Sequence, residues 1–145
     1  MTKFEVPIMS IDYGIKSTGF ALSLDGSNTL FLKDKSTGNL HDILRVIEIY
    51  KPKTIVFGLP INSGSKRQSD IVKSIAGNIN QATKAKIQFQ DERFTSQIAY
   101  STILNETFNK KQQNSNRLAS RKEILAIKDE SSAFIILEMF LAKAL

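Results

Sequence analysis

The stretch from Thr54 to Leu59 (TIVFGL) constrains the fold more than any other, because it is short and apolar at nearly every position. A strand of this kind must be covered on both faces, which is typical of a central strand in an α/β sheet. Apolar residues recur at helical spacing within residues 40–47, before this stretch, and within residues 71–79, after it. The sequence therefore predicts a sheet with helices on both faces.

Four other segments have the composition of strands. Val6–Tyr13, Thr18–Leu24 and Thr29–Lys33 follow one another across short turns, which predicts an antiparallel meander. Lys86–Arg93 alternates in polarity and predicts a fifth strand, and an apolar helix ending at Ala144 closes the chain. The expected fold class is α/β, with a five-stranded mixed sheet in the order 3-2-1-4-5 and helices on both faces.

The length and composition are those of one ordinary globular domain. The 145 residues suffice for a single hydrophobic core and contain no internal repeat or linker, so residues 1–145 are expected to form one domain. No apolar run is long enough to cross a membrane, and the first residues lack the apolar stretch of a signal peptide. We therefore expect a cytoplasmic protein with no membrane partner.

Only a few residue types are available for chemistry. The chain has no cysteine and a single histidine, His41, which falls where a helix begins and is expected to be an exposed residue of its first turn. Carboxylates, hydroxyls, lysine and arginine remain as catalytic or binding groups. The formal net charge of +6 favours a polyanionic partner such as nucleic acid.

Asp12 is the first candidate for a functional carboxylate. It lies near the end of the first predicted strand, on the same face as Ile8 and Ser10. A carboxylate at the end of an apolar central strand costs free energy unless it is paired, hydrogen-bonded or bound to a metal. The alternative is an aspartate that caps the turn before Gly14.

A second candidate, Glu92, ends the fifth predicted strand. Alternation puts it on the face opposite Ile87 and Phe89. We expect the apolar face to meet a helix, which leaves Glu92 on the more open side. Asp91 falls on the apolar face, where it could cap a nearby helix or pair with Arg93. A surface salt bridge between these two neighbours is the simpler alternative and contributes little stability.

The third candidate is Asp129, in the closing helix. That helix is expected to begin at about Glu123 or at Asp129 itself, so the helix dipole alone would favour a carboxylate there. Periodicity hardly separates Asp129 from Glu130. Three acidic positions without useful histidine or cysteine suit Mg²⁺ or Mn²⁺, which prefer oxygen ligands. Two such ions roughly 4 Å apart can support hydrolysis of a phosphodiester.

Four segments, in order along nearly the whole chain, resemble the motifs of the YqgF family. The patterns are D-x-G-x-K-x-x-G-x-A-x-S, V-x-G-L-P-x-N, D-E-R-x-T-S and D-x-x-A-A-x-x-I-L, matched in turn by Ile11–Ser23, Val56–Asn62, Asp91–Ser96 and Lys128–Leu137. Two departures are Ser17, where the family often has arginine, and Ser132, where it has alanine. Both affect fine substrate contacts rather than the metal site.

The resemblance implies a ribonuclease H-like fold and a place among Holliday junction resolvase-like proteins and nucleases of pre-16S rRNA. It implies metal-binding and catalytic roles for Asp12, Glu92 and Asp129, and phosphate contacts for Lys16 and Arg93. Gly58 would let the substrate backbone come close. The implied function is a metal-dependent endonuclease that matures the 5′ end of pre-16S rRNA, with ribosome-associated factors as further partners.

The segment Glu106–Arg121 is polar and aperiodic, and we expect it to be a mobile loop in the free protein. A helix beginning near Thr95 is expected before it. Basic residues of the loop and its flank are predicted to grip substrate phosphates: Lys110, Lys111, Arg117, Arg121 and Lys122. A solvated surface loop is the alternative interpretation.

Three other functions are compatible with parts of the pattern. A DNA endonuclease acting on four-way junctions shares the motifs, as does an RNA-binding ribosome-assembly factor without turnover. The turn from Asp12 to Gly19 also resembles the first phosphate motif of the actin and sugar-kinase superfamily. That architecture needs two such domains and a second phosphate loop, and a single domain of this length offers neither.

Overall fold

The computed structural model of the protein describes residues 3–59, 66–91 and 121–144, and in the last segment it describes side chains from Ser132 to Lys143. The strands are β1 (Ile8–Asp12), β2 (Thr18–Ser23), β3 (Leu30–Ser36), β4 (Thr54–Leu59) and β5 (Lys86–Asp91). The helices of these segments are α1 (Leu40–Tyr50), α2 (Lys66–Thr83) and α4 (Arg121–Ala144).

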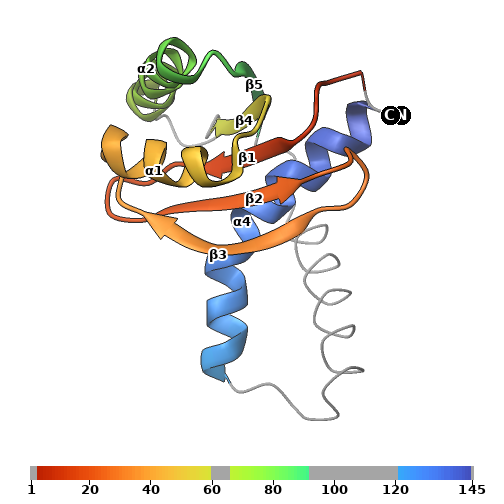
Figure 1. Ribbon diagram of the computed structural model, residues 1–145. Coiled ribbons are helices and arrows are strands. Elements are labelled where there is room, and N and C mark those ends of the chain that lie inside the picture. The colour runs from red at the N-terminus through yellow and green to blue at the C-terminus, as the bar shows by residue number, and fades with distance from the viewer. Residues whose placement is uncertain (1–2, 60–65, 92–120, 145) are drawn as a thin grey trace.

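The five strands form one mixed sheet in the order β3-β2-β1-β4-β5, which confirms the predicted order (Figure 1). The first three strands make an antiparallel meander. β4 lies parallel to β1 on one side and to β5 on the other. The apolar stretch Thr54–Leu59 is thus an inner strand beside β1, and five of its six residues are buried.

Helices cover both faces of the sheet, as predicted (Figure 1). Met9 and Ile11 of β1 point to the face covered by α1 and α2, where the larger core cluster lies. Ile8 points to the other face and packs in a second cluster with residues of α4 such as Leu137. Because strand residues alternate, Ser10 and Asp12 belong to the α4 face.

Local capping explains where α1 begins and ends. Asn39 is its N-cap, and its side chain accepts a hydrogen bond of 2.8 Å from the backbone N–H of His41. At the other end Lys51 adopts a left-handed conformation and donates its backbone N–H to Ile47 O at 2.7 Å, with Pro52 directly after it. His41 is exposed in the first turn, as expected.

Several element boundaries differ from the prediction. β3 runs from Leu30 to Ser36 and so extends three residues past Lys33. Of the two starts expected for α4, about Glu123 agrees to within two residues with the observed start at Arg121, and Asp129 is wrong. Its first residues, Arg-Lys-Glu-Ile-Leu-Ala, favour helix.

The early start of α4 removes one explanation for Asp129. This residue is in the third turn, too far from the N-terminus for the helix dipole to account for a carboxylate. Residues 106–120 of the predicted loop, and the helix predicted from Thr95, lie outside the described residues. No helix in the described segments is long and apolar enough to cross a membrane.

Candidate functional site

Asp12 is the last residue of β1, at the carboxyl end of a central strand. Its neighbour on β2 is Gly19, which carries no side chain to cover it. Ile8 and Ser10, earlier on the same face, are fully buried, whereas Asp12 is partly exposed. The β1 strand therefore delivers one carboxylate to the point where the α4 face of the sheet opens to solvent.

Helix α4 runs antiparallel to β1 across this face. The Ser10 hydroxyl donates a buried hydrogen bond of 2.5 Å to Ala133 O, and the rings of Phe4 and Phe140 lie 4.8 Å apart between centroids. Moving from Ser10 to Asp12 advances roughly 6.6 Å along the strand. Moving back four residues from Ala133 covers roughly 6 Å of helix and reaches position 129.

Position 129 lies about one helical turn before Ala133, toward the end of β1 that carries Asp12. The side chain of Asp129 lies outside the part of the chain whose side chains are described.

The strand β5 supplies the third position through its register with β4. Gly58 pairs with Gln90 and Leu59 with Asp91. Val56 pairs with both Ser10 and Gln88, so Gln88 and Gln90 are on the α4 face, the face of Asp12. Continued alternation would put residue 92 on this face, although Glu92 and Arg93 themselves lie outside the described residues.

The face of β5 that carries Gln88 and Gln90 was expected to be the more open one, and this expectation was wrong at Gln90. Its side chain is 2% exposed because α4 packs over the sheet there, while Phe89 on the supposedly covered face is 42% exposed. The assignment of faces is nevertheless supported, because Asp91 pairs with Leu59 on the opposite side of the sheet from Asp12.

Burial sets the electrostatics of Asp12. Desolvation of the carboxylate raises its pKa from 3.8 to about 6. A partly buried oxygen donor whose negative charge is disfavoured fits a hard divalent cation, because the ion would offset the cost of the charge. Within the described residues no group of three or more acidic or histidine side chains forms a metal site, and Asp12 is the one predicted ligand whose side chain they include.

The turn after Asp12 is tightly built. Thr18 Oγ1 accepts the Gly14 N–H at 3.2 Å and donates to Gly14 O at 2.9 Å. A Cβ on Gly14 would lie 2.3 Å from Ser17 O, so only glycine fits there. The turn presents Lys16 as an exposed side chain four residues beyond Asp12, where it could meet a phosphate held at the carboxylate.

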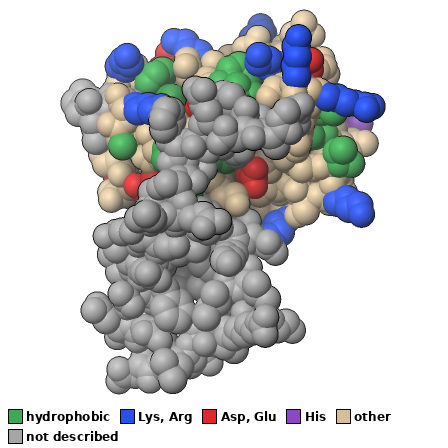
Figure 2. Space-filling view, turned by 180° about the vertical axis from the view of Figure 1, so that it is seen from behind, with side chains coloured by type: hydrophobic (Ala, Val, Ile, Leu, Met, Phe, Trp, Pro, Cys, Tyr) green, Lys and Arg blue, Asp and Glu red, His purple; other side chains and the backbone are tan. Residues whose placement is uncertain are grey.

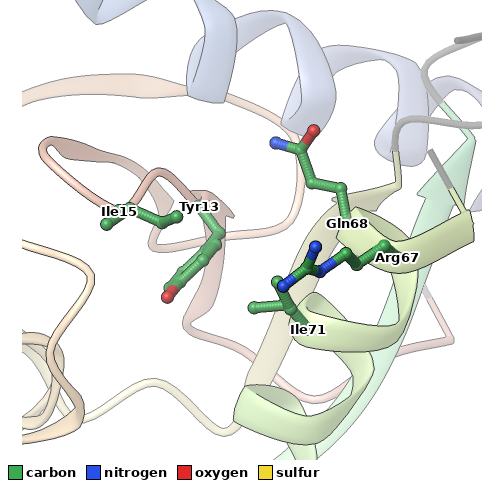
Figure 3. Close-up of a pocket in the computed structure, with 5 residues that line it drawn as sticks. All are labelled: Tyr13, Ile15, Arg67, Gln68 and Ile71. Carbon is green, nitrogen blue, oxygen red and sulfur yellow. The ribbon is translucent and has the colours of Figure 1, made fainter.

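A pocket of about 410 Å³ opens on the other side of the same strand end. It lies between the turn after β1 and the first part of α2, as Figure 3 shows. The described residues that line it are Tyr13, Ile15, Arg67, Gln68 and Ile71. Sequence reasoning missed this pocket, and the one available signal was the aromatic residue directly after Asp12.

The other predicted phosphate-binding residues are placed only in part. Lys110 and Lys111 lie outside the described residues, and Arg121 is placed by its backbone alone, at the start of α4. That end of α4 projects beyond the sheet (Figure 1). Lysine and arginine side chains are spread over the described surface in Figure 2, with fewer acidic ones, as the net charge of +6 requires.

Comparison with known proteins identifies relatives along nearly the whole chain. Residues 6–143 match the family described as "RuvX: Holliday junction resolvase". A protein of Bacteroides thetaiotaomicron is 31% identical over 141 residues, which are 92% of this chain and 94% of the relative. A protein of Rickettsia typhi is 32% identical over 118 residues, 76% of this chain and 75% of the relative. Both relatives carry the name "Putative pre-16S rRNA nuclease". The chain therefore belongs to the RuvX family, and the resemblance to YqgF proteins is confirmed.

Proposed function

We propose that this protein is a metal-dependent endonuclease that hydrolyses phosphodiester bonds at the 5′ end of pre-16S rRNA. Membership of the family makes it a hydrolase that acts on ester bonds in nucleic acid. The observation that carries the proposal is Asp12, a partly buried carboxylate at the end of a central strand, on the face of the sheet that α4 covers.

The proposed metal site uses Asp12, Glu92 and Asp129, with Mg²⁺ or Mn²⁺ as the ion. When bound, the ion supplies Lewis-acid stabilisation of phosphoryl oxygens and lowers the pKa of a coordinated water. Asp12 contributes an ionised oxygen from β1. Position 129 would contribute from α4, and Glu92, the residue after β5 in the sequence, from the face that continued alternation would assign to it.

The substrate is held by groups around these carboxylates. Gly58 is on the Asp12 face of β4 and carries no side chain, which leaves room for a nucleic-acid backbone. We propose that Lys16 and Arg93 contact the phosphate next to the cleaved bond, and that Lys110, Lys111 and Arg121 hold phosphates farther along the strand. Their contribution to affinity is largely electrostatic.

RNA is the proposed substrate because the relatives are named for pre-16S rRNA. The family description favours a second candidate, an endonuclease acting on four-way DNA junctions. Cleavage of pre-rRNA would place the protein in the cytoplasm, with ribosome-associated factors as partners. An RNA-binding assembly factor without turnover is the remaining alternative, and it differs from both enzymes in lacking cleavage.

The direct test compares cleavage of four substrates by the purified protein in Mg²⁺, in Mn²⁺ and with a chelator. These are single-stranded RNA, duplex RNA, an RNA containing the 5′ leader of 16S rRNA, and a four-way DNA junction. We expect metal-dependent cleavage of the leader RNA, lost in Asp12→Asn and retained in Asp70→Asn, an exposed aspartate of α2. Cleavage of the junction alone would establish the DNA enzyme. Binding of RNA without cleavage in any metal would establish the assembly factor.

A further inference from the structure

We propose that the pocket lined by Tyr13, Ile15, Arg67, Gln68 and Ile71 receives one unpaired nucleobase of the strand whose phosphate lies at Asp12. The inference rests on the proposed function, because it assigns the pocket to the same substrate. It adds a property that the carboxylates do not provide: the enzyme would engage a nucleotide that is free of its base pair.

The position of the pocket is the first argument. Tyr13 directly follows Asp12, and consecutive strand residues point to opposite faces, about 3.3 Å apart along the chain. The pocket and the carboxylate therefore flank one strand end. A nucleic-acid strand that crosses this end with a phosphate over Asp12 can turn a neighbouring base toward Tyr13.

The turn that forms one wall of the pocket is held in place by hydrogen bonds to Gly38. The Tyr13 hydroxyl donates to Gly38 O at 3.1 Å, and the Gly38 N–H donates to Ile15 O at 2.9 Å. A Cβ on Gly38 would lie 2.7 Å from Gly14 O, so the two loops are in direct contact. This contact fixes the Tyr13 ring before a ligand arrives, which reduces the entropy lost on binding.

The apolar surface of the pocket suits a flat aromatic ligand. Ile15 is 73% exposed at the rim, while Tyr13 and Ile71 are partly buried within it. Aromatic side chains bind bases through their π-faces, and this stacking tolerates any sequence. The volume of about 410 Å³ is within the range of small-ligand sites and leaves room for one base with part of its sugar.

The polar residues come from α2, on the other side of the pocket. In Figure 3 the Arg67 guanidinium and Ile71 point from the helix toward Tyr13, with Gln68 beside them. The Gln68 amide can both donate to and accept from a base edge. The Arg67 guanidinium can stack on a base or hold the adjacent phosphate. Polar groups of this kind point to a base and not to a purely apolar ligand.

The test is a binding measurement in chelator, where metal-dependent cleavage is off. A short single-stranded RNA is prepared in versions that each lack the base at one position. For the wild type we expect one position, or two adjacent ones, at which loss of the base weakens binding about 5- to 150-fold, which corresponds to stacking of one base on an aromatic residue. Other positions should have little effect.

Matched variants test whether this loss of affinity, called the penalty below, arises in the pocket. Tyr13→Phe keeps the ring but loses the hydroxyl bond to Gly38, and it should keep most of the penalty, whereas Tyr13→Leu and Gln68→Ala should reduce it. Arg67→Gln should weaken binding more than Lys73→Gln, which removes the same charge from an exposed position six residues later on α2. Thermal unfolding checks that Tyr13→Leu is folded, and the exposed Gln68 and Arg67 provide variants that do not disturb the wall.

The outcomes separate this inference from the proposed function. A flat response to base removal, or a penalty unchanged by Tyr13→Leu and Gln68→Ala, would overturn the pocket assignment. Metal-dependent cleavage by the same wild-type preparation would then still support the nuclease. The opposite result is also possible: loss of the base weakens binding, the variants abolish this effect, and the protein cleaves no substrate in Mg²⁺ or Mn²⁺. That result would support the pocket assignment and contradict the proposed nuclease activity.

Discussion

Asp12 shows how a candidate metal ligand can oppose folding. Desolvation raises the pKa of its carboxyl group to about 6, so the folded chain holds this proton more tightly than the unfolded chain, whose value is 3.8. The stabilising contribution is fully present below pH 3.8 and is lost as the pH rises through 6. At neutral pH the metal-free protein therefore carries a charge that costs stability.

The first prediction follows from the direction of this pKa shift, which makes the ionised Asp12 destabilising. Asp12→Asn should raise the free energy of unfolding of the metal-free protein at about pH 8. The rise should be on the order of 1–3 kcal/mol, reduced by the solvent that reaches the partly exposed carboxylate. Well below pH 3.8 the difference should disappear, because the Asp12 carboxyl is then neutral in both the folded and the unfolded chain. Urea unfolding at the two pH values measures it.

The control for that prediction is Asp70→Asn, which removes the same charge from an exposed position on α2. It should change stability little at either pH. If Asp12→Asn were no more stable than Asp70→Asn at about pH 8, the carboxylate would not be desolvated as described.

At the scale of elements, the strand order was predictable because of two sequence features. Short turns between the first three strands leave an antiparallel meander as the simple solution, and the apolar Thr54–Leu59 has to be an inner strand. The start of α4 could be predicted only as about Glu123 or Asp129. Residues 121–126 favour helix individually, but they adjoin a long polar stretch that left the boundary open.

The turn from Gly14 to Thr18 gives the second prediction, in a pair of matched substitutions. Gly14→Ala would place a Cβ 2.3 Å from Ser17 O, so the turn must open and Lys16 must move relative to Asp12. We expect a loss of roughly 1–3 kcal/mol in stability and slower cleavage. Gly77→Ala adds a Cβ in open space within α2 and should gain about 0.5–1 kcal/mol.

Chemical unfolding and the cleavage rate, measured on both variants, check this pair. The turn would be irrelevant to the site if Gly14→Ala were as stable and as active as Gly77→Ala. A variant that is less stable but cleaves normally would mean that the turn supports the fold without positioning Lys16.

At the scale of the molecule, the sequence could suggest three acidic positions but not how the elements that carry them are placed. The Ser10–Ala133 hydrogen bond, between residues 123 positions apart, holds α4 on the face of the sheet that carries Asp12. The pocket beside Tyr13 is likewise formed by a turn and a helix more than fifty residues apart in the sequence. Contacts between residues so far apart leave no pattern in the local sequence. The family motifs do indicate individual site residues, but not how those residues are arranged in space.

The third prediction concerns the net charge of +6 and the strand it attracts. Replacing Lys110 and Lys111 with Gln should weaken binding of single-stranded RNA and flatten the plot of log affinity against log salt by about 0.7 per lost phosphate contact. Lys84→Gln, at the opposite end of the sheet from Asp12, is the control and should leave the slope unchanged. An unchanged slope in the double variant would mean that the segment before α4 does not contact substrate.

The central claim is that three carboxylates from β1, the end of β5 and α4 act together on a phosphodiester. Single-turnover cleavage of the 16S leader RNA in Mg²⁺ or Mn²⁺, by the wild type and by Asp12→Asn, Glu92→Gln and Asp129→Asn, tests it most directly. Loss of a metal ligand removes several kcal/mol of transition-state stabilisation, so each variant should be slower by roughly 100-fold or more, while Asp70→Asn stays at the wild-type rate. A near wild-type rate in any of the three carboxylate variants would contradict the claim.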